Sequence, residues 1–409
     1  MFDTPKLSEF VLLFFFLLET VGLGKISPLA APPDWDWLAN CAHTMTREEF
    51  ARMLQNHYAR NEAAAGWVEL EEGGVRIRTV GDTWQNVPFA TEATGTAPGL
   101  ARFWRKASEM APAPEAKPLL GVKIAIDPGH LGGAWAAMEE RFFQVGKTLP
   151  VAEGDLTLAV AKRLKPMLEK LGAQVVLLRK SDKPVTRLRA KTLESAAAAE
   201  LTGDFSADRL RRQSELFFYR ISEIRARARM VNERLKPDLV LCLHMNAEEW
   251  GEPEHPQLQP RNHLHALVNG NYGPRELESE DIREEMLAQL FGRITEEAIP
   301  LCESVVEALA EETGLPPFTY FSNNASRVGD GAYLYSRNLL ANRLYRAPVV
   351  FLEPYVMNSS PVWKRVQMGD YSGTKLVDGQ PRKSLVNEYA LGVTEGLVRY
   401  FRRERPPAK

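Results

Sequence analysis

Three short apolar runs in this chain lead to a side chain that can bind a metal or transfer a proton. Taken with that residue at its end, the runs are Val122–His130, Leu239–His244 and Val349–Glu353. Runs rich in β-branched residues without polar alternation are typical of strands buried on both faces, as in a parallel sheet covered by helices. Because ligands of such sheets gather beyond the carboxyl ends of the strands, we expect the two histidines and the glutamate to meet at one edge.

Two imidazoles and a carboxylate at one edge are side chains that can hold a hydrolytic zinc ion. Such a site needs about three protein ligands, an open position for water and a nearby base. His130 and His244 would supply two ligands, and a rigidly held Asp or Glu would supply the third. Glu153 immediately precedes a predicted helix, whereas Glu139 and Glu140 lie closer to His130 in the sequence. The residues alone leave these three glutamates as alternatives.

The segments that must position these side chains alternate between strand and helix. Val122–Ile126 predicts a strand, the leucine spacing of Gly154–Leu171 predicts a helix, and Gln174–Leu178 predicts the next strand. This order indicates an α/β fold, with a mostly parallel sheet covered by helices on both faces. The alternation of His263–Val268 is typical of an edge strand, and Ser384–Phe401 predicts a closing helix.

Composition divides the chain into four parts. We expect a signal peptide at 1–24, a small α+β domain of unassigned role at 30–106, an Ala/Pro-rich linker at 107–117 and the main domain at 118–405, with a helical insertion at about 182–234. The apolar run Phe10–Leu18 is too short to span a bilayer but suits the core of a signal peptide. Asp3, Glu9 and Glu19 are unusual for a signal, so the alternatives are a wrongly assigned start codon or a buried helix.

Overall charge and cysteine content limit the classes of partner and fold. The net charge is −2, from 51 basic and 53 acidic residues, which gives no electrostatic reason to expect a nucleic-acid partner. A hydrophobic fraction of 44% excludes a disordered protein. Three cysteines cannot form a framework of several disulfides. We therefore expect a fold held by core packing, whose partner must be inferred from the site.

Four separated motifs resemble the zinc-dependent N-acetylmuramoyl-L-alanine amidases of the type-3 catalytic domain, which are bacterial cell-wall hydrolases. The motifs are Val122–Gly133, Glu153–Arg179, Cys242–Ala247 and Val349–Asn358. They stand in the order of the family and cover about residues 119–403. The resemblance implies that the substrate is peptidoglycan and that the amide between N-acetylmuramic acid and L-alanine is hydrolysed.

The resemblance also implies roles for individual residues. His130, Glu153 and His244 correspond to the ligands of one catalytic Zn²⁺, which favours Glu153 over its two rivals. Glu353 corresponds to the catalytic glutamate that moves protons between water and the departing amine. Further candidates, for orienting the site or contacting substrate, are Asn246, Asn358 and Arg337.

Export to the periplasm or cell envelope follows from the leader and the substrate, with no stable membrane anchor after signal cleavage and with room for a protein activator. Two other functions stay open. The insertions at 182–225 and 248–261 could adapt a zinc hydrolase to another peptide or amide, and the protein could instead be a catalytically idle wall-binding protein. A further hypothesis is that the helical insertion covers the metal and gates access to it.

Overall fold

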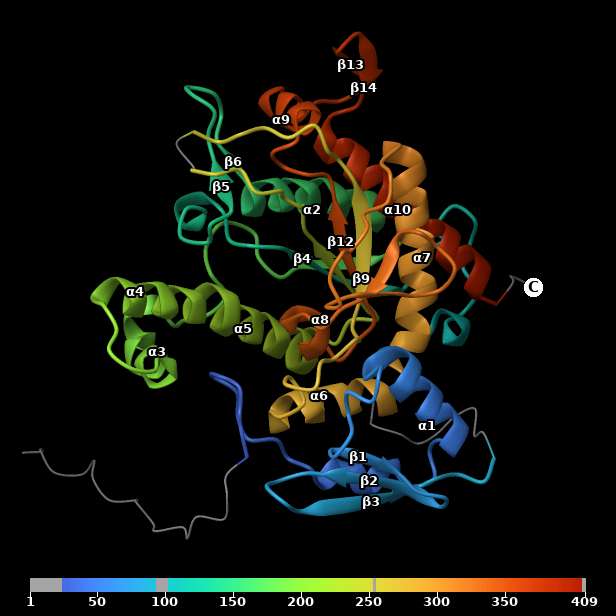
Figure 1. Cartoon of the computed structure of the whole chain (residues 1–409). Helices are drawn as coiled ribbons and strands as arrows, with labels where there is room; N and C mark the ends of the chain where they lie inside the picture. The colour runs from blue at the N-terminus through green and yellow to red at the C-terminus, as the bar shows by residue number, and fades with distance from the viewer. Residues whose placement is uncertain (1–23, 93–101, 253–254, 407–409) are drawn as a thin grey trace, which may run out of the picture.

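A seven-stranded mixed sheet forms the centre of the protein (Figure 1). The computed structural model describes residues 24–92, 102–252 and 255–406, so the predicted signal peptide, up to residue 23, lies outside the described residues. The strands lie in the order β10 (Ser326–Arg327), β11 (Leu334–Ser336), β9 (Leu264–Val268), β12 (Val349–Pro354), β8 (Leu239–Leu243), β4 (Lys123–Pro128) and β7 (Gln174–Leu177).

Most neighbouring strands of this sheet are parallel. β12, β8, β4 and β7 form one parallel block, and β11 pairs parallel with β9. β9 is antiparallel to β12, and β10 is antiparallel to β11. The α/β fold with a mostly parallel sheet is thereby confirmed.

The prediction that His263–Val268 forms an edge strand is wrong. β9 lies inside the sheet, between β11 and β12, and all five of its residues are buried. The alternation was misleading because its polar members are histidines covered by protein. The rings of His263 and His265 pack at a tilt against the Phe318 ring, with centroid distances of 4.5 and 4.9 Å. Pairing between β9 and β12 is non-local, and the sequence pattern carries no sign of it.

Helices cover both faces of the sheet. α2 (Glu153–Lys170), α7 (Ile294–Thr313) and α10 (Leu385–Glu404) pack on the face that carries Ile124, Leu241 and Leu352. The other face packs against α5 (Glu223–Arg229), a wider turn at Met230–Leu235 and α8 (Leu340–Leu344). Smaller elements at the periphery are β5 (Phe142–Phe143), β6 (Val151–Ala152), α9 (Ser360–Gln367), β13 (Lys375–Val377) and β14 (Gln380–Arg382). Within the described ranges, no helix has the length and apolar character needed to cross a membrane.

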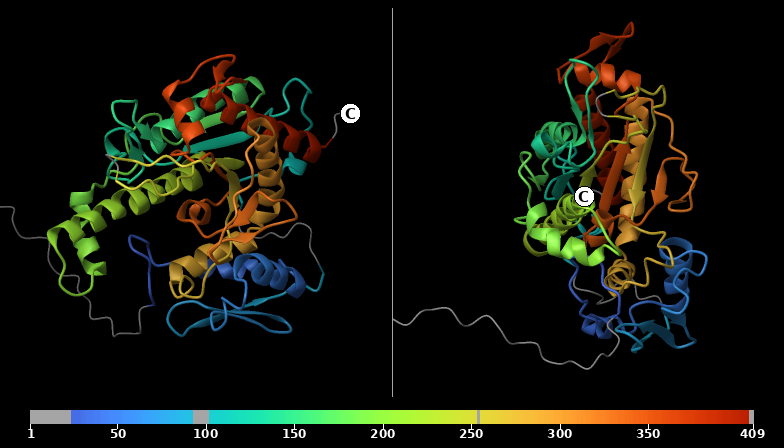
Figure 2. Two further views of the ribbon diagram at one scale, coloured as in Figure 1. Left: turned by 45° about the horizontal axis from the view of Figure 1, so that its top comes forward. Right: turned by 60° about the vertical axis from the view of Figure 1, so that its left-hand side comes forward.

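The N-terminal unit consists of α1 (Arg47–Met53) and an antiparallel sheet of β1 (Val68–Leu70), β2 (Gly74–Arg78) and β3 (Trp84–Pro88). In Figure 2 it lies at one end of the molecule, beside α6 (Glu280–Phe291). One hydrophobic cluster joins it to Met286, Leu290 and Phe291 of α6. Ala107 and Met110, in the predicted linker, are buried in the main core. The two parts share buried surface, and the domain boundaries stay a prediction.

A buried arginine, Arg227, is one of the contacts that anchor the helical insertion to the sheet. The insertion contains α3 (Glu194–Glu200), α4 (Ala207–Leu216) and α5, and its outer helices project from the main body (Figures 1 and 2). Arg227 of α5 is 3% exposed and donates to Asp127 at 2.7 Å and to Glu223 at 2.8 Å. It also donates to the carbonyl oxygens of Pro128 and His130. The insertion therefore holds the segment that follows β4.

Replacing Arg227 by methionine is expected to lower the free energy of unfolding by about 3–5 kcal/mol, because it leaves two buried carboxylates without their cation. Urea denaturation followed by circular dichroism measures this change. Arg211→Gln is the matched control, since Arg211 lies on the same insertion and its ion pairs to Asp208 and Glu215 are on the surface. If the two variants unfolded at the same urea concentration, Arg227 would not anchor the insertion.

Candidate metal centre

His130, Glu153 and His244 come together at the carboxyl edge of the parallel strands. His130 follows β4, His244 follows β8, and Glu153 is the first residue of α2. One possible ligand atom from each side chain lies within 4.8 Å of the other two. Nε2 of His130 is 3.2 Å from Oε2 of Glu153, and Nδ1 of His244 is 3.1 Å from Oε1 of the same carboxylate. Three residues that are distant in the sequence can thus contact one small cation.

Glu153 has the properties of a metal ligand. Its side chain is 1% exposed, and the backbone N–H of Met245 donates to Oε1 at 3.0 Å. Oε2 is buried and accepts no hydrogen bond from any residue that the structure describes. Burial opposes ionisation, but the adjacent His130 and His244 outweigh it and hold the pKa of the Glu153 carboxyl below its ordinary value. The nearest guanidinium atom, Nε of Arg141, lies 3.6 Å from Oε2, an ion pair without a hydrogen bond. Because a buried anionic oxygen without a hydrogen-bond donor is costly, these residues fit a divalent metal.

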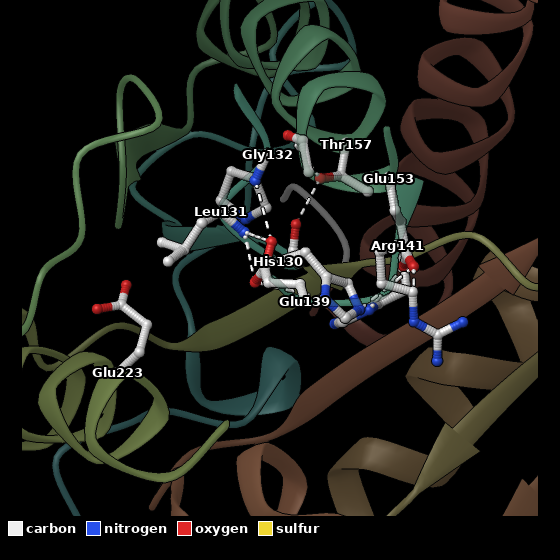
Figure 3. A network of polar contacts seen from close by, with 12 residues as sticks. His130, Leu131, Gly132, Glu139, Arg141, Glu153, Thr157 and Glu223 are labelled. Carbon is white, nitrogen blue, oxygen red and sulfur yellow. Dashed lines mark hydrogen bonds and ion pairs between the residues drawn. The ribbon is translucent and has the colours of Figure 1, made fainter. Parts of the chain in front are cut away.

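The sequence folds tightly around the three side chains. A Cβ on Gly129 would lie 2.3 Å from Cε1 of His244, so only glycine lets the β4 segment pass the ring. Thr157 of α2 donates to the Gly129 carbonyl oxygen at 2.7 Å, which ties α2 to this segment (Figure 3). His130 itself has a φ of 57°, a left-handed conformation that is uncommon for a residue with a side chain. The surrounding hydrogen bonds hold it there.

Gly129→Ala is expected to weaken zinc binding roughly 10–100-fold, the range seen when the support of a metal ligand is lost, because the added methyl group displaces the His244 ring. Competition with a chromogenic chelator measures the affinity. Gly73→Ala is the control, since a Cβ there meets no atom within 4 Å and the residue lies in the N-terminal unit. Unchanged affinity in Gly129→Ala would mean that the position of the ring does not matter for the metal.

The structure separates Glu153 from its two rivals. Glu139 is buried and accepts hydrogen bonds from the backbone N–H groups of Leu131 at 2.9 Å and Gly132 at 3.1 Å (Figure 3). Its Oε1 is 3.6 Å from Nδ1 of His130, on the side of the ring away from Glu153. Glu139 is therefore placed to orient the imidazole and does not belong to the group of three side chains that could share one metal ion. Glu140 is exposed and does not line the cavity described next.

A cavity of about 170 Å³ opens over the three candidate ligands, and Glu353 at the end of β12 lines it. Burial, reinforced by the Glu153 carboxylate and partly offset by His244, raises the pKa of Glu353 above its ordinary value. A carboxyl group with a raised pKa can both take and return a proton near neutral pH. The remaining lining residues are Arg141, Met245, Asn246, His265, Phe318, Tyr320 and Arg337.

The secondary candidates divide into two groups. Asn246 and Arg337 line the cavity. Asn358 does not: it is fully buried, and its Oδ1 accepts from the backbone N–H of Glu248 at 3.0 Å, so it fixes the loop after His244. The helical insertion contributes no described residue to the lining, and the gating hypothesis therefore finds no support.

Sequence reasoning missed His265, Phe318, Tyr320 and Arg141, which all line the cavity. His265 lies directly across from Glu353 in the antiparallel β9–β12 pair, and its Nε2 is 2.9 Å from the hydroxyl of Tyr320. Because β9 runs against β12, its amino end meets the carboxyl end of β12. A prediction that considers only residues after the carboxyl ends of strands therefore misses His265.

Comparison with known proteins gives the family. The family model described as N-acetylmuramoyl-L-alanine amidase matches residues 124–360. CwlD amidase of Clostridioides difficile, solved with the lipoprotein GerS, is similar at 12% identity and a TM-score of 0.38, covering 69% of this chain and 100% of that chain. AmiC2 of Nostoc punctiforme is similar at 15% identity and a TM-score of 0.37, covering 69% of this chain and 98% of that chain. Ami1 of Mycobacterium abscessus is similar at 17% identity and a TM-score of 0.35, covering 69% of this chain and 99% of that chain. No curated protein matches. Because the family model covers more than half of the sequence, the chain belongs to the N-acetylmuramoyl-L-alanine amidase family.

Proposed function

We propose that this amidase hydrolyses the bond between N-acetylmuramic acid and L-alanine of peptidoglycan with one zinc ion held by His130, Glu153 and His244. The observation that carries the proposal is the buried Oε2 of Glu153, which lacks a hydrogen-bond donor within the described chain and lies beside two imidazoles. Two histidines and one glutamate are a ligand set of catalytic zinc in hydrolases, where a further position stays open. The family membership makes peptidoglycan the substrate.

When bound, zinc supplies Lewis acidity toward water and toward the amide carbonyl. The chain supplies the rest. Glu353 accepts a proton from the attacking water and returns it to the nitrogen of L-alanine, so that the amine can leave. Such proton transfer by a positioned group contributes roughly 10²–10⁴-fold to rate. Arg337, on the cavity wall, is placed to donate to a substrate oxygen, and the hydroxyl of Tyr320, which contacts Nε2 of His265, accepts from Arg337 at 3.5 Å and orients it.

Membership of this family places the protein at the cell wall or envelope. We propose that the leader at 1–24 directs export and is removed. Sequencing the amino terminus of the exported protein tests this point. A mature protein that still begins at Met1 would contradict it.

Digestion of purified peptidoglycan, followed by mass spectrometry of the soluble products, tests the proposed function. We expect released peptides that begin with a free L-alanine amine and glycan fragments that keep the lactyl carboxylate of muramic acid. Cleavage at another amide of the peptide would assign the zinc site to a different bond. Binding of peptidoglycan with no product from zinc-loaded protein would instead favour the idle wall-binding alternative.

A further inference from the structure

A second cavity adjoins the catalytic cavity and shares one wall with it. Its volume is about 550 Å³, and Arg337 lines both cavities. The other lining residues are Gly273, Pro274, Arg275, Glu276, Asn323, Asn324 and Asn338. Arg337 is thus a common wall of the two spaces, and we call the second one the Arg275 cavity.

The Arg275 cavity carries uncommitted positive charge. Among the ion pairs of the described residues, none involves Arg275 or Arg337. The carboxylate in the wall, Glu276, is already occupied: its oxygens accept from the backbone N–H of Gly273 at 2.7 Å and from Nδ2 of Asn338 at 2.8 Å. Two guanidinium groups thus face a space in which the one carboxylate already has its donors.

Two nearby arginines, unlike Arg275 and Arg337, form ion pairs with glutamates. Arg343 is paired with Glu285 at 2.5 Å, and Arg346 is paired with Glu284 at 3.0 Å. Arg275 is exposed, and Arg337 donates only to the hydroxyl of Tyr320, at 3.5 Å, so neither charge meets a carboxylate of the described chain in this way. Their positive charge suits an anionic group brought by a ligand, since guanidinium binds carboxylate with two parallel hydrogen bonds.

We propose that the Arg275 cavity binds a carboxylate of the stem peptide, an inference that rests on the proposed function. The two parts of the substrate that flank the cleaved bond differ in charge. In the intact substrate the lactyl carboxyl of muramic acid is bound in the amide, so the glycan presents uncharged hydroxyl and N-acetyl groups, whereas the peptide carries free carboxylates. Because Arg337 lines both cavities, a peptide that leaves the catalytic cavity along this wall would bring its carboxylates to the Arg275 cavity.

The glycan is the competing occupant. Phe321, between the two cavities in sequence, is 93% exposed, and Asn323 and Asn324 present amides on the cavity wall, features that suit a sugar. However, Oδ1 of Asn324 already accepts from Ser322 at 2.6 Å. An uncharged sugar has no anionic group to pair with the two guanidinium groups, which form no ion pair within the described chain. The charge of the Arg275 cavity therefore favours the peptide over the glycan.

The test compares two soluble muramyl-peptide substrates of equal length, one with its acidic side-chain or α-carboxyl free and one with that group amidated. The readout is the ratio of kcat/KM for the two. We expect the zinc-loaded protein to favour the free carboxylate about tenfold, as for a hydrogen bond to a charged group in a partly exposed site, and Arg275→Gln to bring the ratio close to one. Arg275→Lys keeps the charge and should retain most of the preference.

Arg212→Gln is the matched control. Arg212 is an exposed arginine of α4 that pairs with Asp208, and neither residue lines either cavity. It should leave the ratio unchanged. An equal loss on both substrates in Arg275→Gln, or a loss that follows the number of sugars, would overturn the inference and assign the cavity to the glycan.

A binding measurement separates failure of this inference from failure of the proposed function. Calorimetric titration with the free L-alanyl peptide, in its carboxylate and amidated forms, needs no turnover. If the zinc-loaded protein cleaves neither substrate, the proposed function fails, and preferential binding of the carboxylate form that is lost in Arg275→Gln would still support the cavity assignment. Equal binding of the two forms would refute it even in an active amidase.

Discussion

Replacing Glu353 by glutamine is expected to lower kcat roughly 10²–10⁴-fold, the usual contribution of a positioned acid or base, while one zinc ion stays bound. Glutamine has nearly the same shape as glutamate but cannot take a proton from water. Glu353 lines the cavity without belonging to the group of three candidate ligands, so its loss should spare the metal. Release of L-alanyl peptide, measured beside zinc content, checks both halves of the expectation.

Glu307→Gln is the matched control for this change. Glu307 lies on the exposed side of α7, so the variant makes the same change of charge outside the site. It should keep full activity. A Glu353→Gln protein that stays folded, keeps zinc and still releases peptide at the original rate would remove Glu353 from the mechanism.

Replacing Glu153 by alanine is expected to remove zinc and activity together. The variant loses the buried anion that lies between His130 and His244. Without the metal, the pKa of the attacking water is no longer lowered to about 7 and hydroxide becomes scarce at neutral pH, which predicts a loss of activity on the order of 10⁴ or more. Zinc per chain, measured by mass spectrometry of dialysed protein, should fall from near one to near zero.

The two rival glutamates provide matched controls for Glu153. Glu140→Gln changes an exposed carboxylate and should retain both zinc and turnover. Glu139→Gln should keep the metal with roughly 10–100-fold weaker affinity, as expected for a group that orients a ligand. Loss of zinc in Glu139→Gln, with zinc retained in Glu153→Ala, would reverse the assignment of the third ligand.

The sequence predicts the parallel part of the sheet well, because each of its strands can be recognised from a short run of apolar residues. β4, β8 and β12 are short apolar runs, and each leads to a polar residue at the same edge of the sheet. Burial on both faces is what such runs require. The convergence of His130, His244 and Glu353 therefore follows from strand pattern and parallel pairing alone.

The choice among Glu139, Glu140 and Glu153 depends on contacts that no pattern contains. Glu139 is held by two backbone N–H groups of the turn after His130, whereas Oε2 of Glu153 has no donor within the described residues. The resemblance to the amidases favoured Glu153 before the structure did. The physical reason for this preference is the position of Glu153 at the start of α2, which brings its carboxylate into contact with both histidine rings.

The remaining wall of the site could not be predicted because it is built by non-local pairing. β9 inserts antiparallel beside β12, and this places His265 across from Glu353. The loop that carries Phe318 and Tyr320 then packs on β9, with the N–H of Phe318 donating to Leu264 at 3.0 Å. Neither strand direction nor loop position leaves a periodic signal in the amino-acid sequence.

Anomalous diffraction at the zinc absorption edge, from crystals of protein purified without chelator, tests the central claim most directly. We expect one strong peak at about 2.0–2.2 Å from a nitrogen of His130, an oxygen of Glu153 and a nitrogen of His244. Absence of a peak in zinc-supplemented crystals, or a peak held by other side chains, would contradict it.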